Sequence, residues 1–439
     1  MLRPFGIALL LAACGGAPAA AQAPLTLAEA IVRARVQSPD AGSTAASVRE
    51  ADQRVNQARA GFWPRIDLTE SWQRSDQPVF VFSSLLSQRR FTAANFAVDA
   101  LNHPDAVNNF RTAILAEQPL FDSATRSGLT TAAITRQIAE ARRALVTQDL
   151  AVAVTGAFGR TLTAMEARKS AAAAVESARA DRGLAANRRD AGLATDADVL
   201  ALEVFGARAR EQQIRAAADE RTARAELNAL IGEPLTAMFT LDAHAAAADI
   251  DTSALSALEA EALARRPSVA IAVLEERLGA AAVDAAHEAF LPSVSAQGGW
   301  EFDGGTWTNR ASSWMVGAFA RINLFRGFGD KARLAEAREQ LVRRSFERRR
   351  AEDGARLDVY TAAAHLEAAR AAEAVGRAAA AQARESHRIV RDRYEGGLVD
   401  VAGLLRAAEA VVQAEAQEAG AAVGVLVATA TLERALGRQ

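Results

Sequence analysis

The amino-acid sequence contains two copies of one unit, and this internal repeat limits the possible folds more than any other feature. Pro39 and Pro64 are matched by Pro267 and Pro292, which lie 228 residues further along the chain. Later landmarks are matched at a shorter offset of 205 residues, namely Gly192-Leu193 with Gly397-Leu398, and Leu230-Ile231-Gly232 with Ala435-Leu436-Gly437. The first copy therefore has a longer insertion after Pro64 than the second has after Pro292. Insertions of this kind map to loops on one face of a repeat structure.

The repeat divides the chain into parts with definite expected structures. Residues 24–232 form repeat 1 and residues 253–439 form repeat 2, with a linker over 233–252. Each repeat is expected to contain a helix, a β-hairpin and a long helical hairpin. We place the β-hairpins at about 64–121 and 292–325, and the tips of the helical hairpins near 190–195 and 394–400.

The N-terminal segment, residues 1–23, has the pattern of a secretory signal peptide. Arg3 is followed by an apolar stretch and then by small residues, of which Ala19 and Ala21 satisfy the small-x-small rule for cleavage. Alternatively, the residues up to Cys14 fit a bacterial lipobox, in which this cysteine is lipidated and becomes the first mature residue. Both interpretations predict export. Because Cys14 is the only cysteine, no disulfide forms within the chain.

The two hairpin regions alternate between apolar and polar side chains, a pattern typical of β-strands. Ile66, Leu68 and Trp72 alternate with polar residues in the first hairpin, and Trp314 and Val316 share one face of the second. Strands of about ten residues cross a bilayer when tilted, and tryptophan prefers the membrane interface. Beyond the leader we find no uncharged apolar run of about 18 residues, so strands are expected to span the membrane. A soluble sandwich containing two hairpins is the alternative.

Long helical segments flank the hairpins, at 122–189, 195–232, 327–393 and 401–436. At 1.5 Å per residue the longest would reach about 100 Å, which no globular core needs. Two apolar lines follow the segment after the first tip, one through Leu200, Val204, Ala207, Ile214, Ala218 and Ala225, the other through Ala209, Ala216, Ala223, Leu227 and Leu230. This spacing is typical of coiled-coil seams and predicts neighbours on two sides. An antiparallel coiled-coil protein is the alternative.

Four membrane-spanning strands cannot form a closed barrel alone, because an open sheet edge leaves backbone groups unpaired in lipid. Two copies of the chain would supply eight strands, whose interior is filled by side chains, whereas three copies supply twelve and leave a pore. We therefore expect a mainly α fold with a transmembrane β part. Three chains would form a trimeric 12-stranded β-barrel, with four strands per chain, continued by a long α-helical barrel.

Several short motifs, in one order and partly duplicated, resemble the TolC family of outer-membrane efflux proteins, the outer membrane factors of tripartite pumps. The motifs are Leu25-Thr26-Leu27-Ala28-Glu29-Ala30 with Pro39, Ala58-Arg59-Ala60-Gly61-Phe62-Trp63-Pro64, Gln118-Pro119-Leu120-Phe121-Asp122, Ala191-Gly192-Leu193-Ala194-Thr195 with Asp198-Val199-Leu200, and Arg393-Tyr394-Glu395-Gly396-Gly397-Leu398. The resemblance covers the chain from Leu25 to Gly437. It implies the same trimeric barrel and periplasmic tunnel that the pairing argument predicts.

The resemblance also implies roles for residues at the two tips. It places Gly192, Leu193, Gly397 and Leu398 at the periplasmic end of the tunnel, in contact with a periplasmic adaptor. Glycine supplies the positive φ of a tight reversal, and an exposed leucine at each tip favours docking.

Two further tip residues, Asp198 and Tyr394, match family positions that link neighbouring helix pairs, which predicts a contact that constricts the aperture. Gly403 and Arg406 stand where the family's archetype has an acidic ring, so the resemblance does not support an acidic gate here.

The sequence favours no enzyme, cofactor or nucleic-acid function. Its five histidines show no metal-ligand spacing, no nucleophile elbow or phosphate-binding loop is present, and the net charge is −2. We expect an outer-membrane exit duct of a tripartite efflux or type I secretion system, acting as a homotrimer with an adaptor and an inner-membrane pump of the RND or ABC type. A structural coiled-coil envelope protein and a freestanding porin are the alternatives. The sequence does not name the cargo. We place the long 73–108 loop at the cell surface, and the alternatives are that its apolar run plugs the pore or packs under the barrel rim.

Overall fold

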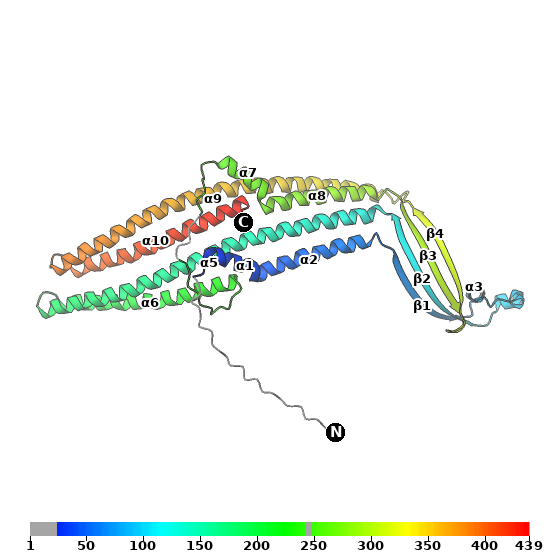
Figure 1. Ribbon diagram of the computed structural model, residues 1–439, viewed down its shortest axis with the longest axis horizontal. Coiled ribbons are helices and arrows are strands. Elements are labelled where there is room, and N and C mark those ends of the chain that lie inside the picture. The colour runs from blue at the N-terminus through cyan, green and yellow to red at the C-terminus, as the bar shows by residue number, and fades with distance from the viewer. Residues whose placement is uncertain (1–23, 243–247, 439) are drawn as a thin grey trace, which may run out of the picture. The chain divides into compact units, whose positions relative to one another are not determined.

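The computed structural model describes residues 24–242 and 248–438 and consists of long helices and one antiparallel sheet (Figure 1). The predicted leader, with Cys14, and part of the predicted linker lie outside the described residues. The elements in chain order are α1 (Leu27–Gln37), α2 (Pro39–Ala60), β1 (Arg65–Ser75), α3 (Pro78–Ser87), η1 (Ala93–Phe96), α4 (Val98–Asn102), β2 (Val107–Phe121), α5 (Ser123–Asp190), α6 (Asp196–Leu230), α7 (Leu255–Arg265), α8 (Pro267–Glu288), β3 (Ser293–Gly304), β4 (Ala311–Arg321), α9 (Gly329–Glu395) and α10 (Val401–Leu436).

The chain forms two compact units, and each unit combines parts of both repeats. Of the described residues, one unit contains those up to Pro39 together with those within Asp149–Asp251 and Ala364–Leu432, and the other contains Asp40–Gln148, Thr252–Ala363 and those from Glu433. The sheet, α2 and α8 belong to the second unit, whereas α6 and the hairpin tips belong to the first. The long helices α5 and α9 run through both units, so the units do not coincide with the predicted repeats.

Elements at matched positions of the two repeats have the same lengths. Helices α1 and α7 each contain 11 residues, and α2 and α8 each contain 22. The second pair begins at Pro39 and Pro267, the prolines that reveal the repeat, and proline favours the first turn of a helix because that turn leaves its N–H groups unpaired. The sequence offset of 228 thus corresponds to a real structural equivalence.

The matched glycines Gly232 and Gly437 end the helical hairpins in the same backbone conformation, with φ of 75° and 77°. A Cβ atom on Gly232 would lie 2.8 Å from the carbonyl oxygen of Gln37, and one on Gly437 would lie 2.7 Å from the carbonyl carbon of Arg265. Gln37 and Arg265 are themselves matched, as the last residues of α1 and α7. Only glycine combines a positive φ with this close backbone approach.

The long helices confirm the predicted helical segments to within about two residues at most ends, as helix boundaries allow. In α6, the apolar line through Ala209, Ala216 and Leu227 is buried, while Leu200 and Ile214 of the other line are exposed. Within one chain α6 therefore has a packing partner on one side only. The line through Leu200 and Ile214 has the spacing of a coiled-coil seam but no packing partner among the described residues.

By length and composition, helix α10 could cross a membrane, and one third of its most apolar stretch is buried. Charged residues interrupt α10, so it contains no run of 18 uncharged residues, as expected. Leu404, Leu432 and Leu436 of α10 are fully buried in the fold, as in a core helix of a soluble part. Its apolar character alone is weak evidence for a membrane span.

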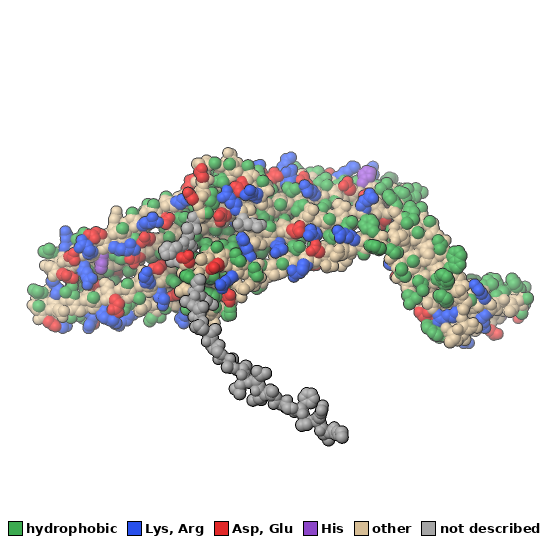
Figure 2. All heavy atoms as spheres, in the orientation of Figure 1, with side chains coloured by type: hydrophobic (Ala, Val, Ile, Leu, Met, Phe, Trp, Pro, Cys, Tyr) green, Lys and Arg blue, Asp and Glu red, His purple; other side chains and the backbone are tan. Residues whose placement is uncertain are grey.

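The four strands form one sheet in the order β1-β2-β3-β4, and every neighbouring pair is antiparallel. Register places Leu68 opposite Ile114, Ile114 opposite Trp300, and Trp300 opposite Trp314, so these four share one face. That face is apolar and exposed, and Figure 2 shows hydrophobic side chains gathered over the strands. The opposite face carries polar residues such as the Arg111–Glu301 ion pair. The predicted alternation is thereby confirmed.

The long loop of the first hairpin, predicted over 73–108, forms α3, η1 and α4 beyond the end of the sheet (Figure 1). Gln88 anchors it, because its side-chain amide donates to the carbonyl of Asn108 at 2.8 Å and to Oδ1 of Asn109 at 3.0 Å. Arg89 adds a hydrogen bond to the carbonyl of Ser312 on β4, at 2.9 Å. The insertion is a folded segment attached to the strand ends.

Candidate functional site: the tips of the helical hairpins

The two tips have the same backbone geometry. Gly192 and Gly397 both have a φ of 74°. The N–H of Leu193 donates to the carbonyl of Arg188 at 2.7 Å, and the N–H of Leu398 donates to that of Arg393 at 2.9 Å. Together with the N–H groups of the glycines, these bonds form the Schellman motif that ends a helix in a left-handed residue. The positive φ expected for both glycines is observed.

Both tip leucines project into solvent. Leu193 is 69% exposed and Leu398 is 79% exposed. Because each leucine is the residue after a left-handed glycine, its side chain is carried outside the helix end, where no residue of the same turn covers it. Exposed apolar side chains therefore stand at equivalent positions of both tips, which is an unusual use of solvated turns.

The helices that follow the tips begin with different caps. Thr195 and Asp198 form a capping box at α6, in which the Thr195 hydroxyl accepts from the N–H of Asp198 at 3.3 Å and the carboxylate accepts from the N–H of Thr195 at 2.9 Å. At α10, Asp400 itself caps the helix, accepting from the N–H of Gly403 at 2.8 Å. Gly403 therefore occupies the position equivalent to Asp198, and no carboxylate is needed there.

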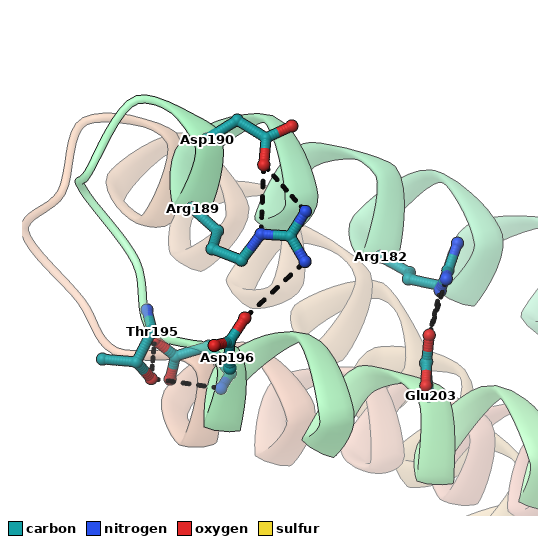
Figure 3. A network of polar contacts seen from close by, with 7 residues as sticks. Arg182, Arg189, Asp190, Thr195, Asp196 and Glu203 are labelled. Carbon is teal, nitrogen blue, oxygen red and sulfur yellow. Dashed lines mark hydrogen bonds and ion pairs between the residues drawn. The ribbon is translucent and has the colours of Figure 1, made fainter.

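Ion pairs join α5 to α6 near the first tip (Figure 3). Arg182 binds Glu203 with two nitrogens, at 2.8 and 2.6 Å, and Arg189 binds Asp190 at 2.7 Å and Asp196 at 3.6 Å. All of these side chains are substantially exposed, so water screens each pair and its contribution to stability is small. They orient the turn rather than stabilise the fold.

One contact joins the two tips to each other. Arg188, near the end of α5, donates from Nη1 to the carbonyls of Tyr394 at 3.0 Å and Glu395 at 2.8 Å, the last two residues of α9. Its guanidinium also lies 5.3 Å from the centre of the Tyr394 ring. A cation placed at the negative end of a helix satisfies carbonyls that have no partner within the helix. Sequence reasoning missed Arg188, because its partners lie more than 200 residues away.

The two residues expected to constrict the aperture lie near each other but are not hydrogen-bonded within the chain. The Asp198 carboxylate binds Thr195 instead, and among the described residues the Tyr394 hydroxyl has no hydrogen-bond partner, although Tyr394 is only 4% exposed. Burial raises the pKa of the Tyr394 hydroxyl, against the opposing charge of Arg188, and the charge of Asp198 raises it further. The constricting contact stays a prediction.

The contact between α5 and α9 just above the tips contains polar atoms that are buried without a hydrogen-bond partner in the described chain. They are Oδ1 of Asp181, Nε of Arg188, Nε2 of His387, Nε of Arg391 and Oη of Tyr394. Asp181 and Arg391 lie 3.6 Å apart, too far for a hydrogen bond. Burial raises the pKa of Asp181, and the charges of Arg391 and His387 oppose this effect.

A groove of about 570 Å³ lies among α5, α6 and α10 in the same unit, lined by residues that include Ala171, Phe205, Ala209, Val412 and Ala416. Among residues 24–242 and 248–438, no group of three or more His, Cys, Asp or Glu side chains could hold a metal ion.

Comparison with known proteins agrees with this geometry. The family model described as "Outer membrane efflux protein" matches residues 30–233 and 258–438. The chain belongs to the outer membrane efflux protein family. The two matched segments also contain most of the two predicted repeats. Membership confirms the resemblance to TolC-type channels and places the protein in the outer membrane, with its helical part in the periplasm.

Individual efflux-family relatives support the fold over nearly the whole length. The chain is 30% identical over 400 residues to Protein CyaE of Bordetella pertussis, covering 87% of this chain and 78% of that protein. It superimposes on the CmeC outer membrane channel of Campylobacter jejuni with a TM-score of 0.76 and 15% identity, covering 94% and 85% of the two chains. The corresponding values for the outer membrane protein VceC of Vibrio cholerae are 0.74, 18%, 94% and 96%. These similarities confirm the expected mainly α fold with a small β part.

Proposed function

We propose that this protein is the exit duct of a tripartite efflux or type I secretion system, and that three chains form the conduit. The observation that carries this proposal is the pair of free sheet edges. Among the residues that the structure describes, strands β1 and β4 each pair on one side only, and they carry exposed apolar side chains such as Leu68 and Val316. In lipid, unpaired backbone groups cost several kcal/mol each, so these edges need partners.

The partners are other copies of the same chain. Three sheets of four strands make twelve strands, the number that leaves a pore, whereas two sheets would make a filled barrel of eight. The helical part supports the same assembly, since no described residue covers the exposed apolar line of α6 through Leu200 and Ile214. Three chains would cover this line with a neighbouring helix pair and close a tunnel below the barrel.

The duct would work with a periplasmic adaptor and an inner-membrane pump of the RND or ABC type. Two exposed leucines per chain, Leu193 and Leu398, give six equivalent apolar points in a trimer. Apolar points on rigid turns suit the loops of adaptor hairpins, which must dock without changing the fold of the channel. Passive conduction needs no catalytic group, so we propose no enzymatic activity.

The protein purified in detergent is expected to migrate as a trimer before heating and as a monomer after heating, and to conduct ions in planar lipid bilayers. A structural coiled-coil protein of the envelope would not conduct. A freestanding porin would conduct but would support export without adaptor or pump. A water-soluble monomer that never enters detergent micelles would contradict the proposal.

We also propose that Asp198 and Tyr394 contribute to a constriction in the assembled duct. The double substitution Asp198→Ala, Tyr394→Phe is expected to raise single-channel conductance. Among the described residues the Tyr394 hydroxyl has no hydrogen-bond partner, so its removal alone should leave the stability of the single chain unchanged. A conductance change in the single Tyr394→Phe variant would therefore report a partner supplied by the assembly. A double variant that conducts like the parent would contradict this role.

A further inference from the structure

The contact made by Arg188 has an unused counterpart in the second repeat. The offset of 205 that relates the tips places Arg393 in the position of Arg188, five residues before the tip leucine in each copy. The Arg393 side chain is exposed, and its guanidinium has no hydrogen bond or ion pair within the described residues. One of two equivalent arginines thus joins two tips, while the other points into solvent.

The end of α5 offers Arg393 the same acceptors that the end of α9 offers Arg188. Arg188 binds the carbonyls of Tyr394 and Glu395, and the matched carbonyls are those of Arg189 and Asp190. A carbonyl oxygen has two lone pairs. That of Tyr394 accepts from both Gly397 and Arg188, whereas that of Arg189 accepts only from Gly192 among the described residues. One acceptor position at the first tip is therefore open.

The proposed trimer brings these unused groups together. In a ring of three chains with two repeats each, first and second tips alternate, so every junction between chains joins a second tip to the first tip of the next subunit. A heterologous contact of this kind repeats around a closed ring. Within one chain, Arg188 at the first tip reaches the second tip. At the equivalent junction between two chains, Arg393 at the second tip therefore reaches the first tip of the next subunit.

We propose that Arg393 binds the end of α5 in the neighbouring subunit, through the carbonyls of Arg189 and Asp190, as Arg188 binds the end of α9 in its own chain. Six arginine contacts then hold the six tips, and their leucines, in one ring. This inference rests on the proposed trimer. The ring places the adaptor-docking leucines at regular intervals, which a symmetric partner requires.

The six arginine contacts fall into two groups of different strength, three within the chains and three between subunits. Within the chain the guanidinium of Arg188 lies over the aromatic ring of Tyr394, 5.3 Å from its centre, which adds a cation–π attraction to the hydrogen bonds. At the matched position of the first tip stands Arg189, whose charge is balanced by Asp190 and which offers no aromatic face. The three contacts between subunits are therefore the weaker ones, and the tips should separate first at the subunit boundaries.

Cross-linking with a short bifunctional thiol reagent tests the contact directly. A disulfide would not reach, because it requires Cα atoms within about 7 Å and an arginine spans more. The variant Arg393→Cys, Asp190→Cys is expected to yield covalent dimers and trimers on denaturing gels. The matched variant Arg188→Cys, Glu395→Cys should cross-link within one chain and produce no higher mass. The unsubstituted protein, whose only cysteine is Cys14, is the control and should give no covalent dimer or trimer.

A second measurement uses a milder change. Arg393→Gln keeps an exposed polar side chain, so the fold is retained, and the expected result is a higher single-channel conductance in trimers of normal stability. Trimers that form and conduct, but show neither the intersubunit cross-link nor a conductance change in Arg393→Gln, would overturn the inference while leaving the exit duct intact. Absence of trimers in the unsubstituted protein would instead contradict the proposed function.

Discussion

A variant that carries both Leu193→Asp and Leu398→Asp is expected to lose export completely while still forming trimers in the outer membrane. The two leucines are 69% and 79% exposed, so their replacement removes no packing within the chain. In a complex, each buried leucine contributes about 1.5–3 kcal/mol, and a carboxylate in the same place would have to lose its water. With two tips in each of three chains, the penalty is repeated six times.

Export by cells that produce the cognate pump and adaptor is the measurement, with the amount of unheated trimer as the check on assembly. Ala191→Asp is the matched control, because it adds the same charge at the exposed first tip without removing a leucine. The control should export normally. Unimpaired export by the double leucine variant, at normal trimer levels, would refute docking at these tips.

The substitution Val316→Arg should prevent assembly in the outer membrane. Val316 lies at the middle of β4, is 78% exposed and shares the apolar face with Trp300 and Trp314. An arginine on the lipid face near the bilayer midplane costs about 2–4 kcal/mol in a transmembrane barrel. Three chains per barrel multiply this cost, so the trimer fraction in the membrane should fall to a small part of that of the parent.

The matched control is Ser313→Arg on the same strand. Register places Ser313 opposite Glu301, on the polar face of the sheet, where an arginine finds an opposite charge. Its trimers should reach normal levels. Equal assembly of the two arginine variants, measured as heat-modifiable trimer in isolated outer membranes, would show that the two faces of the sheet do not differ in environment.

Local sequence patterns were sufficient to predict the long helices and the strands. Apolar periodicity located the four long helices and alternation located the strands, because each pattern reports which face of an element is buried. Such patterns did not predict the structure of the 73–108 loop. Its apolar run at Pro78–Phe82 opens the helix α3, and a short apolar run has no period long enough to distinguish a helix from a loop that fills a pore.

At the tips of the helical hairpins, too, the sequence predicted some features and not others. The sequence predicted the left-handed glycines, because a tight reversal followed by leucine recurs at matched positions. It did not predict that Asp198 caps its own helix or that Arg188 joins α5 to the end of α9. Both depend on which of several nearby acceptors a flexible side chain reaches, and short sequence motifs do not contain that information.

The sequence by itself determined the repeat, the type and extent of the main elements and the family, because these follow from periodicity and from residues close together in the chain. Only the tertiary structure decided which apolar line of α6 is buried, that both sheet edges are free, and that one of two equivalent tip arginines is used within the chain. Such features depend on contacts between residues far apart in sequence, where the competition among partners is settled by geometry.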